Sequence, residues 1–215
     1  IGTQALRVLE QNYPHMEIAY LTTRSNIALL DEQTRRYKVR GVAIADENAA
    51  HEFKKQSSFN GEVLVGDEGV CQAAGHEANT VVLSALVGFS GVMPTLAAIE
   101  QGTTIALANK ETLVSAGEIV MRAARGRGVK IIAVDSEHSA ILQCVVGEEH
   151  EAIEKLIITA SGGPFRNYSR EDLEHVTAEQ ALKHPNWNMG AKITVDSSTL
   201  MNKGFEVIEA RDRKS

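Results

Sequence analysis

The most constraining feature of the sequence is a regular alternation of short β-branched runs with stretches of helical periodicity. The apolar runs are rich in Val and Ile and are mostly bounded by Gly, Asp, Asn or Ser, which is typical of strands. They occupy residues 16–21, 62–65, 80–86, 103–108, 129–134, 155–160 and 192–195. Helices are expected near residues 47–56, 68–74, 93–101, 111–125 and 139–146, after a first helical pattern at the N-terminus. This alternation predicts a mostly parallel sheet that is covered by helices on both faces.

Composition narrows the class of protein further. The chain has 215 residues, enough for one or two domains, and a formal net charge of -6 with its basic residues scattered. A scattered basic set argues against nucleic acid or an anionic membrane as the partner. No apolar run approaches the ~20 residues of a membrane span, and the N-terminus shows no charged-then-apolar leader. Cys71 and Cys144 form no CxxC pair, so a reducing, cytoplasmic compartment is expected.

The character of the sequence changes near residue 135, and a domain boundary is expected there. Residues 1–134 keep the regular rhythm of a nucleotide-binding layer. In residues 135–215, polar and turn-forming residues interrupt the apolar segments more often, and this part contains the only Trp of the chain. We therefore expect a nucleotide-binding domain over 1–134 and a second domain over 135–215.

Two acidic residues, Asp135 and Glu137, directly follow an apolar run. In an extended segment residues two apart point the same way, so both carboxylates could converge at the carboxyl end of a strand. Open α/β sheets bind their ligands at that edge, and carboxylate oxygens suit a hard divalent cation such as Mg²⁺ or Mn²⁺. The alternative is a solvated strand end without a ligand.

A second polar group lies on a predicted helix near the C-terminus. Asn202 and Glu206 are four residues apart and share one helix face, with Lys203 beside them and Ser197 or Ser198 as an N-cap. Such a face could hold a phosphorylated, metal-chelating small molecule, or it could be an ordinary capped surface helix.

Two loops could complete such a site. The turn at residues 161–164 contains two glycines that let backbone N–H groups approach an anion, although a Gly-Gly-Pro turn is often only a turn. The loop at 184–190 joins a His, a Trp and a Met between Pro and Gly, and either packs as a plug or closes as a lid.

The intact dinucleotide fingerprint GxGxxG is absent, but other cofactor signals are present. Arg24 follows an expected strand where an acidic residue would favour NAD, and it is flanked by hydroxyl residues. An arginine there suits the extra phosphate of NADP. Residues 109–111, Asn-Lys-Glu, end another expected strand and could serve cofactor or substrate.

Several of these stretches recur in one known family. They are LVGFSG (86–91) with PTL (94–96), ALANKE (106–111), VDSEH (134–138), ASGGPFR (160–166), HPNW (184–187) and the segment 195–210. In this order they resemble the 1-deoxy-D-xylulose 5-phosphate reductoisomerase family across nearly the whole chain. The resemblance implies a Rossmann-like doubly wound NADPH-binding domain followed by an α/β catalytic domain in a homodimer. It also implies NADPH- and metal-dependent conversion of the sugar phosphate to 2-C-methyl-D-erythritol 4-phosphate, in a bacterial cytoplasm or a plastid.

The resemblance also implies roles for individual residues. The metal ligands for Mg²⁺ or Mn²⁺ would be Asp135, Glu137 and Glu206, supported by Glu209. The substrate would be held by Lys110, Ser136, Glu137, Ser161, His184, Trp187, Ser197, Asn202, Lys203 and Glu206. NADPH would contact Ile1, Arg24, Ser25, Asn26, Asn109, Glu111, Met189 and Gly190. Of these residues, Lys110, Asp135, Glu137, His184 and Glu206 form the expected catalytic set.

The sequence also departs from the family pattern at both ends. Only Ile1-Gly2 remains of the glycine-rich turn, and residues 211–215 are highly polar where the family continues with an apolar segment. We therefore expect a fragment that lacks the first strand and the C-terminal domain. Two alternatives stay open: another NADP-linked sugar-phosphate oxidoreductase, and an inactive fragment or binding module.

Overall fold

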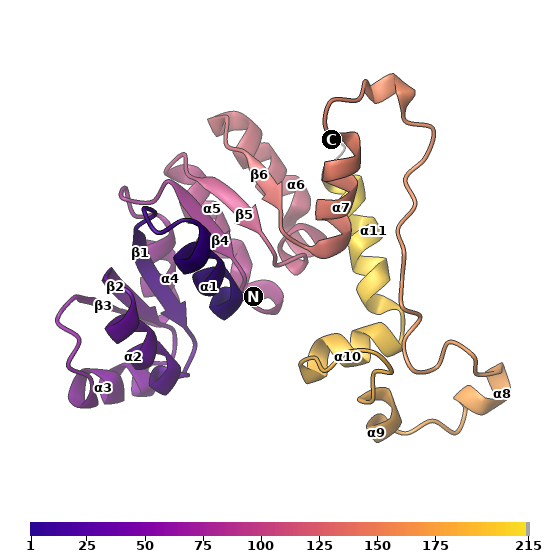
Figure 1. Cartoon of the computed structure of the whole chain (residues 1–215), viewed down its shortest axis with the longest axis horizontal. Coiled ribbons are helices and arrows are strands. Elements are labelled where there is room, and N and C mark those ends of the chain that lie inside the picture. Colours follow the sequence, from indigo (N-terminus) through magenta and orange to yellow (C-terminus); the bar gives the residue numbers. More distant parts are fainter. Residues whose placement is uncertain (214–215) are drawn as a thin grey trace. The chain divides into compact units, whose positions relative to one another are not determined.

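The chain forms an α/β fold with parallel sheets (Figure 1). The structure is a computed structural model that describes residues 1–213, with residues 150 and 211–213 described by their backbone alone. The chain divides into two compact units, Ile1–Val134 and Asp135–Ser215. No helix within residues 1–213 combines the length and the apolar character that a bilayer span requires.

The first unit contains two three-stranded parallel sheets. The first sheet has the order β1 (Ile18–Thr23), β2 (Val39–Ile44), β3 (Glu62–Val65). The second has the order β4 (Val81–Ser84), β5 (Thr104–Leu107), β6 (Ile131–Ala133). Five of these strands correspond to expected runs, whereas β2 was not predicted because Arg40 and Gly41 interrupt its apolar residues.

Helices follow the strands as the alternation predicted. They are α1 (Gly2–Asn12), α2 (Ile27–Arg36), α3 (Glu47–Gln56), α4 (Gly66–Ala74), α5 (Val92–Glu100) and α6 (Glu111–Arg127), with a 3₁₀ turn at Gly88–Gly91. Side-chain caps start two of them: Asn26 accepts a hydrogen bond from the N–H of Leu29, and Asp46 accepts one from the N–H of Ala49. Helix α2 was not predicted from the sequence.

The two sheets carry separate cores. Beside the first sheet, Phe53 of α3 packs with Leu30, Val42 and Ile44. Beside the second sheet, a larger cluster combines residues of α5, β5 and α6, namely Ile99, Ile105, Leu107, Leu113 and Val120. Burial of these side chains removes apolar surface from water and is the main force that holds helices against strands.

Within residues 135–213 the second unit contains helices and irregular segments but no strand. Its helices are α7 (Ser136–Val145), α8 (Arg170–Leu173), α9 (Ala178–Ala181), α10 (Ala191–Ser198) and α11 (Met201–Arg213), with a 3₁₀ turn at His150–Ala152. The strands expected at 155–160 and 192–195 are wrong: the first segment is irregular and the second lies inside α10. In the first segment no neighbouring strand pairs with the chain, and Ile157 remains 71% exposed. For the second, the periodicity of a short β-branched run does not distinguish a strand from a helix.

The C-terminal end of α6 offers a test of glycine placement. Gly128 ends the helix in the left-handed region with φ 65°, whereas Gly126 lies within it and meets nothing where a Cβ would be. We expect Gly128→Ala to lower the free energy of unfolding by about 1–2 kcal/mol. Gly126→Ala should raise it by about 0.5–1 kcal/mol, because alanine loses less backbone entropy on folding. Urea denaturation of both variants measures the difference, and equal signs would contradict the prediction.

Candidate functional site

Three carboxylates converge in the second unit. Asp135 is the N-cap residue of α7, Glu137 lies in the first turn of that helix, and Glu206 lies on α11. One oxygen of each carboxylate lies within 4.8 Å of the others. An extended backbone was expected to bring Asp135 and Glu137 together, and that expected conformation is wrong, since Glu137 lies in helix α7. Their convergence comes from the start of α7 and from its packing against α11.

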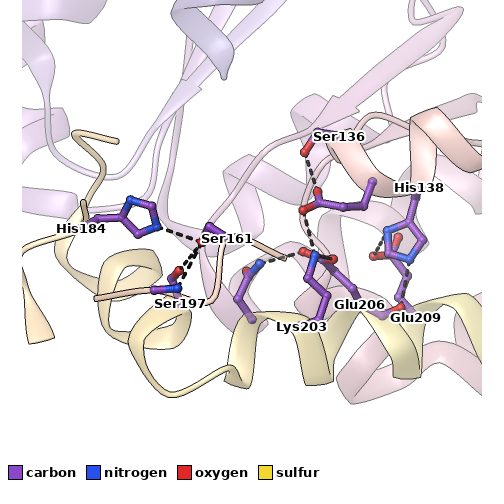
Figure 2. A network of polar contacts seen from close by, with 11 residues as sticks. Ser136, His138, Ser161, His184, Ser197, Lys203, Glu206 and Glu209 are labelled. Carbon is purple, nitrogen blue, oxygen red and sulfur yellow. Dashed lines mark hydrogen bonds and ion pairs between the residues drawn. The ribbon is translucent and has the colours of Figure 1, made fainter. Parts of the chain in front are cut away.

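Lys203 lies beside two of these carboxylates, those of Glu137 and Glu206 (Figure 2). Its Nζ donates to Glu137 Oε1 at 2.8 Å and also to Glu206 Oε2. Asn202 Nδ2 donates to Glu206 Oε1 at 2.7 Å, as expected for side chains four apart on one helix face. Glu206 is fully buried, and both of these donors bind its carboxylate.

The ammonium of Lys203 controls the ionisation of Glu137. Burial raises the pKa of Glu137, but hydrogen bonds from Lys203 and from Ser136, whose Oγ lies 2.5 Å from Glu137 Oε2, outweigh it and lower that pKa to about 2. Burial lowers the pKa of Lys203, and its bonds to Glu137 and Glu206 outweigh that effect and raise it. Carboxylate and ammonium therefore both stay charged across the physiological range.

Replacing Lys203 with Met should raise the pKa of Glu137 above about 2, because the donor is lost while the burial remains. In the parent chain this depressed pKa contributes stability that is present above pH 4.5 and is lost as the pH falls toward 2. The variant should lose less stability over that window. Carbon-detected NMR titration of the glutamate carboxyls in metal-free buffer measures the shift. Lys192→Met removes an ammonium that pairs with Asp196 at 2.9 Å, and it should leave Glu137 unchanged.

A buried histidine, His138, joins α7 to α11 and was not singled out by the sequence analysis. Its Nε2 lies 2.9 Å from the backbone oxygen of Glu206, and its Nδ1 lies 3.0 Å from Glu209 Oε2. His138 and Glu209 are both buried, with 4% and 0% exposure. The contact fixes the turn of α11 that carries Glu206. The only sequence signal was the position of His138 next to Glu137, since its partners lie far away in the sequence.

A second polar cluster joins the Gly-Gly turn to α10. Ser161 Oγ lies 3.0 Å from His184 Nε2 and 3.4 Å from Ser197 Oγ (Figure 2). His184 Nδ1 accepts hydrogen bonds from the N–H groups of Asn186 and Trp187, so Nε2 carries the proton and donates to Ser161. Ser197 was expected to start a helix, but it lies in the last turn of α10.

The backbone of Gly163 explains the glycines of this turn. Gly163 has φ 64°, and a Cβ at this residue would lie 2.7 Å from the backbone oxygen of Ser197. Gly162 is also left-handed, with φ 80°. The turn therefore lies directly against the end of α10, and this approach places Ser161 beside Ser197.

The remaining expected residues of the second unit lie on its surface or near it. Ser136 is exposed, Trp187 is 65% exposed, and Met189 is half-buried. Gly190 is the N-cap residue of α10, and its carbonyl accepts bonds from Thr194. These residues border the loop at 184–190, whose role as plug or lid stays a prediction.

In the first unit, the expected cofactor residues lie at carboxyl ends of strands. Arg24, Ser25 and Asn26 follow β1 and are exposed, and the side chain of Asn26 caps α2. Ile1 is 58% exposed at the start of α1.

A second expected group in the first unit follows β5. Asn109 is buried there, and its Nδ2 donates to the backbone oxygen of Gly88 and to Glu111 Oε2. It braces the turn at Gly88–Gly91, and Lys110 beside it is only 8% exposed. Contact of Asn109, Lys110 and Glu111 with cofactor or substrate stays a prediction.

The sequence pattern of the 1-deoxy-D-xylulose 5-phosphate reductoisomerase family matches residues 1–117, and that of its C-terminal domain matches residues 131–212. The chain belongs to this family. Similar curated proteins include 1-deoxy-D-xylulose 5-phosphate reductoisomerase of Thermoanaerobacter sp. strain X514, 48% identical over 211 residues. The same enzyme of Caldanaerobacter subterraneus is 50% identical over 211 residues. Each alignment covers 98% of this chain and 55% of the relative, so the chain spans about half the length of these reductoisomerases.

Solved structures of reductoisomerases share the fold. The enzyme of Zymomonas mobilis in complex with NADPH is 38% identical, with a TM-score of 0.87, over 98% of this chain and 54% of that chain. A complex with NADPH, fosmidomycin and magnesium is 35% identical, with a TM-score of 0.88, over 98% of this chain and 55% of that chain. The likeness confirms the Rossmann-like α/β fold that the sequence predicted.

Proposed function

We propose that the protein containing this chain converts 1-deoxy-D-xylulose 5-phosphate to 2-C-methyl-D-erythritol 4-phosphate, with NADPH as reductant and Mg²⁺ or Mn²⁺ as the metal. The observation that carries the proposal is the convergence of Asp135, Glu137 and Glu206, the last two of which bind the ammonium of Lys203. Membership of the family and the NADPH and magnesium complexes of its relatives support the same reaction.

The donor set fits a hard divalent cation. Asp135, Glu137 and Glu206 would hold the metal through oxygen, and Glu209 with His138 would support Glu206 from behind. The Lys203 ammonium already binds two of these carboxylates, and this placement of a positive charge supports the assignment of a cation site. When bound, the metal would supply Lewis acidity that polarises the ketone and hydroxyl oxygens of the substrate.

The second polar cluster suits the phosphate of the substrate. Ser161 and Ser197 present hydroxyl groups, and the Nε2–H of His184 can turn from Ser161 to a phosphate oxygen. Lys203 and Asn202 lie on the same face of α11 as Glu206, so one helix would reach both the metal and the phosphate. Binding the remote phosphate holds the reacting carbons in place, and that binding energy supports the chemical step.

Further residues expected from the family resemblance would position substrate and cofactor. Lys110 and Ser136 would contact the hydroxylated end of the substrate, and Trp187 would cover it. The cofactor would be held by Ile1, Arg24, Ser25, Asn26, Asn109, Glu111, Met189 and Gly190. An exposed arginine after β1 suits the extra phosphate of NADPH, which supplies hydride to the aldehyde formed by the rearrangement.

The proposal is tested on the protein that contains this chain. NADPH oxidation should require both 1-deoxy-D-xylulose 5-phosphate and Mn²⁺, and chelation of the metal should stop it. A folded protein without turnover would refute the proposal. Turnover of other sugar phosphates without metal would favour a different NADP-linked oxidoreductase, since simple dehydrogenation needs no such carboxylate cluster.

For the 215-residue chain itself, isothermal titration with NADPH separates an active unit from an inactive fragment. Tight binding would argue against the fragment. The finer expectations from the sequence are part of the same proposal: a homodimer, which sedimentation equilibrium would test, and a location in the bacterial cytoplasm, which cell fractionation would test.

A further inference from the structure

Leu200, between α10 and α11, has a left-handed backbone. Its φ is 60°, and within residues 1–213 it is the only residue other than glycine with a positive φ. This conformation is unfavourable for a residue with a Cβ, because the Cβ comes too close to the following carbonyl oxygen. Strain of this kind persists only where the surrounding structure imposes it, and it is concentrated at functional sites.

Leu200 belongs to both helices through its hydrogen bonds. Its N–H donates to the carbonyl of Ser197 at 3.2 Å, and its carbonyl accepts from the N–H of Gly204 at 3.0 Å. A left-handed helix end normally has Gly or Asn, and the residue before a helix is normally Ser, Thr, Asp or Asn. Leucine is preferred in neither position, so the local sequence does not select this turn.

The helices on each side are held by other parts of the second unit. The end of α10 lies against the Gly-Gly turn, where a Cβ on Gly163 would lie 2.7 Å from the backbone oxygen of Ser197. Helix α11 is held by His138, whose Nε2 lies 2.9 Å from the backbone oxygen of Glu206. Because both helices are fixed in this way, the residue between them takes the φ that connects them.

The turn at Leu200 decides which side chains can reach one ligand. Ser197 lies three residues before it and Lys203 three residues after it, and both belong to the polar network of Figure 2. In an uninterrupted helix, residues six apart would lie about 120° apart around the axis and ~9 Å apart along it. They would then face different directions. The left-handed residue breaks the helix and removes this restriction.

We propose that Leu200 is a positioning residue, whose left-handed backbone places the hydroxyl of Ser197 and the side chains of Asn202 and Lys203 around the phosphate of one sugar-phosphate substrate. The identity of that ligand rests on the proposed function. The side chain of Leu200 is 53% exposed, and the role belongs to its backbone. Substrate binding should therefore follow the tolerance of residue 200 for a positive φ.

Two substitutions in the protein that contains this chain separate backbone from side chain. Leu200→Ile keeps every atom type but branches at Cβ, which makes a positive φ much less favourable. The KM for 1-deoxy-D-xylulose 5-phosphate should rise at least ~10-fold, since about a tenth of the molecules or fewer would hold the binding-competent turn. Leu200→Asn loses the apolar side chain but tolerates the left-handed region, so its KM should stay within about twofold of the parent value.

The kinetic constants distinguish positioning from a general loss of structure. In the Leu200→Ile variant kcat should change less than about twofold, because the molecules that bind substrate have the parental arrangement. The KM for NADPH should not change. The control is Gly147→Ala, which places a Cβ on another left-handed residue of this unit, with φ 88°, where the Cβ meets nothing within 4 Å. It should leave both KM values unchanged.

Hydrogen exchange tests the turn itself in the 215-residue chain, without substrate or cofactor. In the Leu200→Ile variant the amides of residue 200 and of Gly204 should exchange at least ~10-fold faster, because their hydrogen bonds depend on this turn. The amide of Thr194, which bonds to Gly190 at the other end of α10, should not change. If the parent protein turned over no substrate, the proposed function would fail, and this measurement would still decide on the turn.

Three results would overturn the proposal. The first is a folded Leu200→Ile variant with parental KM and parental exchange at Gly204. The second is an equal rise in KM for Leu200→Asn, which would assign the role to the leucine side chain. The third is an equal rise for Gly147→Ala, which would make the effect one of stability alone.

Discussion

Glu206→Gln is expected to lower metal-dependent turnover at least ~100-fold while the chain remains folded. Glu206 is fully buried and belongs to the three carboxylates whose oxygens lie within 4.8 Å of one another. Glutamine keeps the size of the side chain but removes the charge, so the cluster holds one negative ligand fewer for a hard cation. The amide also offers one oxygen where Asn202 and Lys203 both donate. Calorimetric titration with Mn²⁺ measures the loss of affinity directly.

The control for this prediction is Glu148→Gln, which removes a charge from an exposed side chain of the same unit. It should leave metal affinity and turnover within about twofold of the parent protein, because surface charges contribute little. Circular dichroism of both variants tests the fold. Near-parental Mn²⁺ affinity in a folded Glu206→Gln variant would show that Glu206 is not a ligand.

Gly163→Ala is expected to disrupt the second polar cluster of Ser161, His184 and Ser197, and to lower the free energy of unfolding by about 2–5 kcal/mol. About 1–2 kcal/mol comes from the left-handed conformation at φ 64°. The rest comes from the Cβ, which would lie 2.7 Å from the backbone oxygen of Ser197 and must displace backbone, at a cost of about 1–3 kcal/mol. Because α10 must move, Ser161 should lose Ser197 as a neighbour. Urea denaturation gives the stability, and the KM of the protein that contains this chain would report on the proposed binding of the substrate phosphate.

Gly147→Ala separates the two causes. Gly147 has φ 88° in the same unit, but a Cβ there meets nothing within 4 Å. This variant should show the conformational cost of about 1–2 kcal/mol alone and an unchanged KM. Equal effects of the two substitutions would mean that the contact of Gly163 with α10 contributes nothing.

Local signals in the sequence were sufficient for much of the first unit. Helix Glu47–Gln56 and strand Glu62–Val65 were predicted with the bounds that the structure has, because Asp46 caps the helix and the strand is a short apolar run. Strand β2 was missed because Gly41 weakens its pattern. The ring of Tyr20 requires that glycine, since a Cβ there would lie 2.5 Å from the ring. Because this contact is between two strands, the sequence of β2 alone does not reveal why a glycine is needed at residue 41.

In the candidate site, too, some contacts follow from local sequence spacing and others depend on tertiary packing. The stacking of Asn202 on Glu206 follows from helical spacing and is confirmed by their 2.7 Å hydrogen bond. The pairing of His138 with Glu209 depends on how α7 packs against α11, and sequence spacing holds no information on it. The segment 192–195 was predicted as a strand from its β-branched residues, but it is helical, and Thr194 bonds back to the carbonyl of Gly190. Tertiary packing overrides a weak local preference in such short segments.

The division of the carboxylates between two helices has a thermodynamic consequence. Asp135 and Glu137 stand at the start of α7 and Glu206 stands on α11, with residues 146–200 between the two helices. An ion bound by all three would act as a non-covalent crosslink that closes a long loop, and it would do so only in the folded unit. The melting temperature of the second unit should therefore rise with the concentration of free divalent cation, by mass action. The cell's supply of that ion would then influence how long the polypeptide survives proteolysis.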